Sequence, residues 1–243
     1  MFWKRWDVLH PKTSCNRSYW QKGKDRSFVE NWRPISLVNV DTKIMSKVIA
    51  SRIRSVLPNI IHHNQTGYVK DRFIGETIRS IYDIMDYTVE ENIPGLLIFI
   101  DFEKAFDSEE WDFLFKCLEA FNFGSDFLRW IKTFNTNVQS CVMNYGTASN
   151  YFSLERGVRQ WDPLSPYLFI VVVETLAIAI RQNQEIRRIS IDNEETKILQ
   201  YADDTTAVLS DISSAEQKRW VCGLGRPKKI KQNLLESNDL MSR

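Results

Sequence analysis

The stretch Gln200-Tyr201-Ala202-Asp203-Asp204-Thr205 places two adjacent carboxylates between two segments with the character of β-strands. Residues 196–201 lead into the acidic pair, and the apolar run 206–209 follows it. Because Asp favours turns, the pattern predicts a hairpin with Asp203 and Asp204 at its tip. Adjacent negative charges repel each other unless a cation lies between them. Taken alone, the pair is more typical of a solvated turn, so its meaning depends on a third carboxylate.

That third carboxylate is Asp101, which follows the short apolar run 96–100 after Pro94-Gly95. A continuous apolar run of this length predicts a buried central strand with Asp101 at its C-terminal end. If this strand and the hairpin are neighbours in one sheet, three carboxylates meet at its edge. Carboxylates suit Mg²⁺, which keeps several waters and takes further oxygen ligands from substrate phosphates. Two such ions would promote phosphoryl transfer.

Composition narrows the class of protein. The 243 residues are 43% hydrophobic and 26% charged, as in globular proteins, and the net charge of +1 gives no global field typical of a nucleic-acid partner. The four cysteines form no C-x-x-C pair, which predicts a reduced intracellular compartment, nucleus or cytoplasm. No signal-peptide pattern is apparent, and the apolar-rich run 169–180 is too short to cross a bilayer, so no membrane partner is expected.

Hydrophobic periodicity predicts the remaining elements. Asp41 is the expected cap of the first helix, whose apolar positions include Val40, Ile44 and Val48, and Pro58 is its expected end. Asp107 or Ser108 is expected to cap the third helix. Residues 1–21 are expected to be irregular, and the periodicity weakens beyond residue 210. The predicted helices cover about 42–57, 76–91, 109–121, 125–137 and 166–182, and further strands are predicted over about 141–145, 151–154, 186–192 and 196–201.

Five segments carry a resemblance to a known family: residues 31–37, 65–68, 99–107, 156–166 and 201–204. In order and spacing they resemble the blocks of reverse transcriptases from non-LTR, LINE-type retrotransposons. Residues 99–107 (FIDFEKAFD) are similar to the first catalytic block, 156–166 to the nucleotide-binding block and 201–204 (YADD) to the second metal block. An ordinary α+β domain with acidic loops does not explain five ordered blocks.

The resemblance implies an α+β, right-hand polymerase fold with an antiparallel palm sheet backed by helices. The fingers are expected over residues 22–95 and the catalytic palm over 96–210, after an irregular leader at 1–21. Residues 211–243 do not resemble the family's thumb and are expected to form a divergent basic tail. The family's endonuclease is also missing, so the sequence is expected to be a fragment of a retrotransposon polyprotein.

The resemblance also implies RNA-directed DNA polymerisation, in which a DNA primer's 3′-hydroxyl attacks the α-phosphate of a deoxynucleoside triphosphate paired to an RNA template. Two Mg²⁺ ions, with Mn²⁺ as the alternative, are implied as cofactors. The implied metal ligands are the carboxylates of Asp101, Asp203 and Asp204 and the backbone carbonyl of Phe102.

Further residues take positions that the family uses for the nucleotide. Phe106 stands where an aromatic ring stacks under the sugar and rejects a ribose 2′-hydroxyl; its alternative role is core packing. Gln160 and Arg159 stand where the family contacts the incoming nucleotide and template, and Arg33 is a candidate triphosphate contact from the fingers.

Trp161 departs from the family, which has glycine at this position. A bulky residue there would obstruct the nucleotide or force a disfavoured backbone angle, so Trp161 is expected to lower or abolish polymerisation. The alternative function is therefore a catalytically dead remnant that binds nucleic acid, and a relic without function is the third reading.

Overall fold

The structure is a computed structural model that describes residues 13–20, 23, 25–28, 31–102, 104–144, 147–184, 186, 189–191, 194–210 and 227–235. It divides into two compact units. Unit 1 comprises residues 1–53 and 106–168, and unit 2 comprises residues 54–105 and 169–243. The expected division into fingers and palm follows the family resemblance and stays a proposal.

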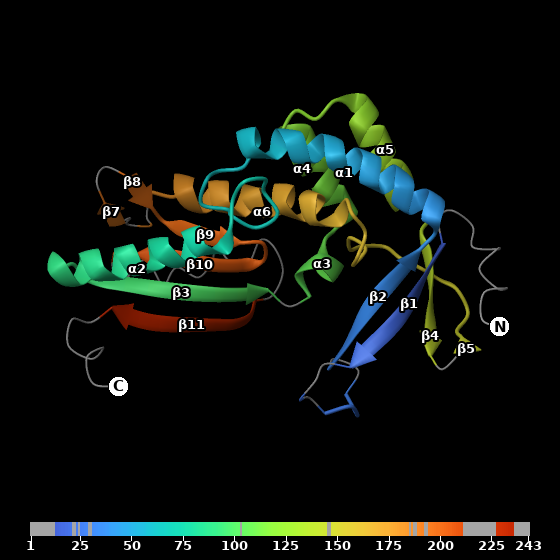
Figure 1. The fold of residues 1–243 in the computed structure, drawn as a ribbon, viewed down its shortest axis with the longest axis horizontal. Helices are drawn as coiled ribbons and strands as arrows, with labels where there is room; N and C mark the ends of the chain where they lie inside the picture. The colour runs from blue at the N-terminus through green and yellow to red at the C-terminus, as the bar shows by residue number, and fades with distance from the viewer. Residues whose placement is uncertain are drawn as a thin grey trace. The chain divides into compact units, whose positions relative to one another are not determined.

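Unit 2 is built on a four-stranded antiparallel sheet in the order β11-β3-β10-β9 (Figure 1). The strands are β3 (Gly95–Phe102), β9 (Ile198–Tyr201), β10 (Asp204–Leu209) and β11 (Pro227–Leu235). Since β3 has a partner on each side, the predicted central strand is confirmed. A separate hairpin joins β7 (Ile189–Ile191) to β8 (Glu194–Thr196).

Alternation along β3 sends its side chains to two apolar cores. Leu96, Ile98 and Ile100 pack with Leu176 and Ile180 of α6 (Ser165–Gln182). The opposite face carries Leu97 and Phe99, which pack with side chains of α2 (Ile74–Glu90). The predicted antiparallel sheet backed by helices is therefore present in unit 2.

Unit 1 contains a sheet in the order β2-β1-β4-β5, with β6 also paired to β4. β1 (Thr13–Trp20) lies antiparallel to β2 (Trp32–Val38) and parallel to β4 (Gln139–Asn144). The short strands are β5 (Thr147–Ala148) and β6 (Phe152–Ser153). Helices α4 (Trp111–Ala120) and α5 (Ser125–Asn135) lie wholly in this unit, and the single turn α3 (Ala105–Ser108) precedes them.

Several local predictions were wrong. Residues 13–20 form a strand where irregular structure was expected. Strand β11 lies in the segment 211–243, whose assignment as a divergent basic tail stays a prediction. The first helix, α1 (Val40–Ile60), continues past Pro58, and the side chain of Asn39 accepts the backbone N–H of Asp41 in the capping role assigned to Asp41. The first turn of α4 follows Glu110, with no side-chain cap from Asp107 or Ser108.

Helix α1 leaves exposed several apolar residues that recur at helical spacing in the sequence. In α1 the buried stripe is Ile49, Ile53 and Leu57, whereas Val40, Ile44 and Val48 are exposed.

Among described helices, α6 alone is long and apolar enough to cross a membrane by length and composition, but 61% of it is buried within the protein. That burial is typical of a core helix.

Candidate active site

Asp101 lies near the end of β3, next to the edge where the apolar core stops. It shares the face of Leu97 and Phe99 because strand residues two apart point the same way. Unlike those residues, Asp101 is exposed to solvent. The buried strand therefore carries this carboxylate to the surface of unit 2, as its sequence predicted.

Asp203 and Asp204 occupy the β9–β10 hairpin, whose two-residue turn is Ala202-Asp203. In the pairing of β10 with β3, Thr205 lies opposite Ile100, so Asp204 and Asp101 are the next positions along that register. Asp204 also shares the face of Val208, which belongs to the same core as Leu97. The carboxylates of Asp101 and Asp204 thus start from one face of two adjacent strands.

Electrostatics reflect this proximity. Burial raises the pKa of Asp204, and the negative charges of Asp203 and Asp101 raise it further. The pKa of Tyr68 is also raised, first by burial and then by the charges of Asp203 and Tyr201. The three acids therefore interact as like charges at one end of the sheet.

Within the described part of the chain, no group of three His, Cys, Asp or Glu side chains is arranged to hold a metal ion. Mg²⁺ in polymerase-type sites uses one or two carboxylates and completes its shell with water and substrate phosphates. The donor set of Asp101, Asp203 and Asp204 fits that mode of binding rather than an all-protein cage.

In unit 1, residues 156–160 lie against the segment that runs from α3 to α4. Backbone bonds join Val158 N to Phe106 O (2.8 Å) and Gly157 N to Glu109 O (2.7 Å). The Trp111 indole N–H donates to Gly157 O at 2.9 Å. Gly157 has φ +89°, and a Cβ there would lie 3.0 Å from Asp107 O, so glycine is needed for both reasons. The loop that the resemblance assigns to the nucleotide is thus held by residues 106–111.

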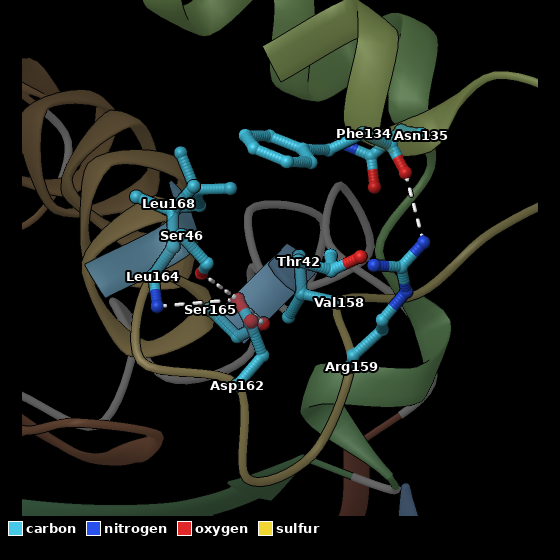
Figure 2. Close-up of a pocket in the computed structure, with 10 residues that line it drawn as sticks. All are labelled: Thr42, Ser46, Phe134, Asn135, Val158, Arg159, Asp162, Leu164, Ser165 and Leu168. Carbon is cyan, nitrogen blue, oxygen red and sulfur yellow. Dashed lines mark hydrogen bonds between the residues drawn. The ribbon is translucent and has the colours of Figure 1, made fainter. Parts of the chain in front are cut away.

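Arg159 faces a small cavity of unit 1, of about 20 Å³, rather than open solvent (Figure 2). Its guanidinium donates to Phe134 O at 2.9 Å, and burial lowers its pKa. In the same cavity Asp162 Oδ2 accepts from Ser46 Oγ at 2.8 Å, whereas Asp162 Oδ1 is buried with no partner among the described residues. The cavity has room for about one water, which would satisfy that oxygen.

The other predicted residues take varied positions. Phe106 lies in α3 and is half-buried. Arg33 lies in β2, opposite Tyr19 of β1 in the antiparallel ladder. Trp161 has φ +69°, in the left-handed region, and its side chain is 73% exposed. The expectation that a residue other than glycine is forced into a disfavoured backbone angle here is confirmed.

One residue of the site had no role assigned from sequence. Gln65 is 1% exposed and bonds to the backbone of Ala202, next to Asp203. The only sequence signal was its place in the segment 65–68, because a contact between residues 137 positions apart leaves no local pattern.

Comparison with known proteins follows the same residues. Residues 20–224 match the family model described as "Reverse transcriptase (RNA-dependent DNA polymerase)". The chain is 30% identical over 207 residues to the "Transposon TX1 uncharacterized 149 kDa protein" of Xenopus laevis, covering 84% of this chain and 16% of that protein. It is 24% identical over 205 residues to a "Retrovirus-related Pol polyprotein from type-1 retrotransposable element R2" of Popillia japonica, covering 82% of this chain and 28% of the relative.

Solved structures of low sequence identity share the fold. Apo telomerase from Candida tropicalis, truncated from its C-terminal domain, matches with a TM-score of 0.62 at 11% identity, covering 93% of this chain and 51% of that one. Telomerase from the same species in complex with a fragment of telomeric RNA matches with a TM-score of 0.66 at 11% identity, covering 95% and 42%. The chain spans less than a third of the length of the Xenopus laevis and Popillia japonica relatives.

Proposed function

The chain belongs to the reverse transcriptase (RNA-dependent DNA polymerase) family, as in non-LTR retrotransposons, and from that premise we propose that it catalyses RNA-templated extension of a DNA primer. The substrates are deoxynucleoside triphosphates, and the reaction is two-metal nucleotidyl transfer to the primer 3′-hydroxyl. The fingers (22–95) and palm (96–210) are proposed as the functional division.

The observation that carries the proposal is the set of three carboxylates at one end of the unit 2 sheet. Asp101 and Asp204 lie on one face of the adjacent strands β3 and β10, and Asp203 lies in the turn that connects β9 to β10. Among the side chains that the structure describes, which exclude those of β11, the ion pairs involve none of the three. Carboxylates grouped in this way are stabilised by a bound cation.

The residues divide the catalytic work as follows. Asp101 and Asp203, with the backbone carbonyl of Phe102, hold the metal ions, and Asp204 assists. Bound Mg²⁺ would activate the 3′-hydroxyl and stabilise charge on the leaving pyrophosphate. In this proposal the ligands come from adjacent, hydrogen-bonded strands and their connecting turn, which supports a preorganised arrangement.

Unit 1 supplies the nucleotide contacts in this proposal. Gln160 is held by Asp107 in a loop whose backbone is bonded to Phe106 and Glu109, which supports a fixed orientation toward a ligand. Phe106 provides the aromatic floor, and Arg33 contacts the triphosphate. Arg159 holds the loop against α5 through Phe134, besides the nucleotide contact that the family resemblance implies.

The second candidate function is nucleic-acid binding without polymerisation. Trp161 favours it, because a bulky residue with φ +69° stands where the family has glycine. Binding of this kind would depend strongly on salt, because neutralising phosphates releases counterions.

Primer extension on an RNA template with Mg²⁺ separates the two. We expect incorporation by the 243-residue chain or by Trp161→Gly, and none by Asp203→Asn. If neither protein extends the primer while both retain salt-dependent RNA binding, polymerisation is excluded and the binding function stands.

A further inference from the structure

The loop of residues 64–67 extends the unit 2 sheet beside β9. Gln200 N donates to Asn64 O at 2.8 Å, and Thr66 N donates to Gln200 O at 2.9 Å, so residue 65 forms a parallel bridge to residue 200. Arg72 holds this loop from its other side, donating to Gln65 O at 2.9 Å. The loop is therefore fixed on both sides next to the hairpin that carries Asp203.

From this loop, the side chain of Gln65 reaches both backbone polar groups of one residue in the turn. Its Oε1 accepts Ala202 N–H at 2.9 Å and Gly67 N–H at 2.9 Å. Its Nε2 donates to Ala202 O at 3.2 Å. The amide oxygen faces two N–H donors and the amide nitrogen faces a carbonyl acceptor, so only one orientation of the amide satisfies all three groups. Because Gln65 is 1% exposed, water does not replace these bonds.

The turn needs such support. Ala202 has φ +55°, in the left-handed region that costs a non-glycine residue about 1–2 kcal/mol. It also precedes two carboxylates, of which Asp204 is repelled by both Asp203 and Asp101. Gly67 approaches so closely that a Cβ would lie 2.2 Å from Ala202 N. Strained residues persist where their surroundings over-determine them, and here Gln65 and Gly67 do so.

We propose that Gln65 is a positioning residue for metal binding: by bonding both backbone groups of Ala202, it fixes the turn that presents Asp203. This inference rests on the proposed function, because positioning matters only if Asp203 binds a cation. Gln65 touches neither the metal nor the substrate. Its role is to set the position of a carboxylate through the neighbouring peptide groups.

The test is Gln65→Met, which keeps the length of the side chain and removes all three hydrogen bonds. Two quantities are measured on the 243-residue chain: the hydrogen-exchange rate of the Ala202 amide, and the affinity for Mn²⁺ alone by electron paramagnetic resonance. Binding that Asp203→Asn abolishes defines the relevant site. We expect faster exchange at Ala202 and an increase of at least tenfold in the Mn²⁺ dissociation constant at that site.

Thr77→Val is the matched control. It removes a buried hydroxyl that contacts Thr66 at 2.6 Å in the same loop, without contacting the turn. We expect its Mn²⁺ affinity to stay within twofold of the unchanged chain. If Gln65→Met loses its cooperative thermal transition, Gln65→Asn is measured instead, since it stays neutral and polar but is one methylene too short to keep all three hydrogen bonds; at least threefold weaker binding is then expected.

Unchanged Mn²⁺ affinity in a folded Gln65 variant would overturn the inference. Absence of primer extension with Mn²⁺ binding intact would count against the proposed polymerase function alone. The two failures are therefore distinguishable.

Discussion

The side-chain amide of Gln160 donates to both carboxylate oxygens of Asp107, each at 3.1 Å. The nitrogen of the amide is thereby committed to Asp107, and its oxygen remains the group of Gln160 available to a ligand. In the family pattern these residues belong to two separate blocks, 53 positions apart. Within unit 1 the contact joins Asp107 to the loop 156–166, which the resemblance assigns to the nucleotide.

Replacing Asp107 by Ala frees Gln160 and should impair nucleotide binding more than chemistry. We expect the KM for deoxynucleoside triphosphate to rise about tenfold, as for loss of one charge-assisted hydrogen bond, with a smaller change in kcat. Steady-state primer extension measures both. Mn²⁺ affinity serves as the control and should not change; a loss of metal binding would place Asp107 among the metal ligands instead.

Trp161→Gly should raise primer-extension activity by tenfold or more. Glycine adopts φ +69° without strain and removes an indole that is 73% exposed beside the loop of Gln160. Thermal stability should change little, because relief of about 1 kcal/mol of strain offsets the greater entropy of glycine in the unfolded chain. Trp161→Ala is the control: it removes the ring but keeps the strained φ, so it separates obstruction from strain. Equal activity of all three proteins would refute the prediction.

Sequence reasoning succeeded where the signal was local. The apolar run 96–100 predicted β3 to within two residues of its observed bounds. The paired acids predicted the β9–β10 hairpin, although its turn is Ala202-Asp203 and Asp204 begins β10. In each case adjacent residues determine the structure, through continuous burial or turn chemistry.

The sequence did not predict contacts between residues that are far apart in the chain. β11 contains three lysines in its first five residues and has no strand-like alternation, yet it pairs along all of β3. The apolar pattern of α1 gave no means of choosing between Ile49-Ile53 and Ile44-Val48 as the buried side, because that choice depends on what packs against it. Gln65 contacts Ala202 for the same long-range reason.

Asp204→Asn should stabilise the protein at neutral pH. The pKa of Asp204 is raised in the folded state, so ionisation of its carboxyl destabilises the fold. The free energy of unfolding therefore falls as pH rises from the unfolded pKa to the folded pKa. We expect a gain of a few tenths of a kcal/mol up to about 1 kcal/mol at pH 7 without divalent metal, and none at pH 3. Thermal melts measure it, with Asp86→Asn on the exposed side of α2 as control. A lower melting temperature at pH 7 would contradict the repulsion of Asp204 by its neighbours.

Arg72→Lys should destabilise unit 2 by about 2–4 kcal/mol. The two terminal nitrogens of this guanidinium donate to four backbone carbonyls, those of Pro58, Ile61, His62 and Gln65, at 2.6–3.3 Å. An ammonium keeps the charge but is a single point donor and leaves some of these carbonyls unsatisfied. Chemical denaturation measures the loss. The exposed Arg79→Lys, whose ion pair with Asp83 spans 3.6 Å, should change stability by less than about 0.5 kcal/mol; similar losses in both would show that the four bonds contribute little.

Glu109 should make the protein less stable as pH rises. Burial, followed by the charge of Glu110, raises the pKa of Glu109 from 4.5 to about 8. Between these values the folded state keeps a proton that the unfolded state has lost, so the free energy of unfolding falls as pH increases from about 4.5 to 8 and then levels. Glu109→Gln removes this dependence: its melting temperature should exceed that of the unchanged chain by several degrees at pH 9 and equal it at pH 4. Glu110→Gln, at an exposed position, should retain most of the dependence, and parallel pH profiles for the Glu109→Gln variant and the unchanged chain would show that Glu109 ionises normally.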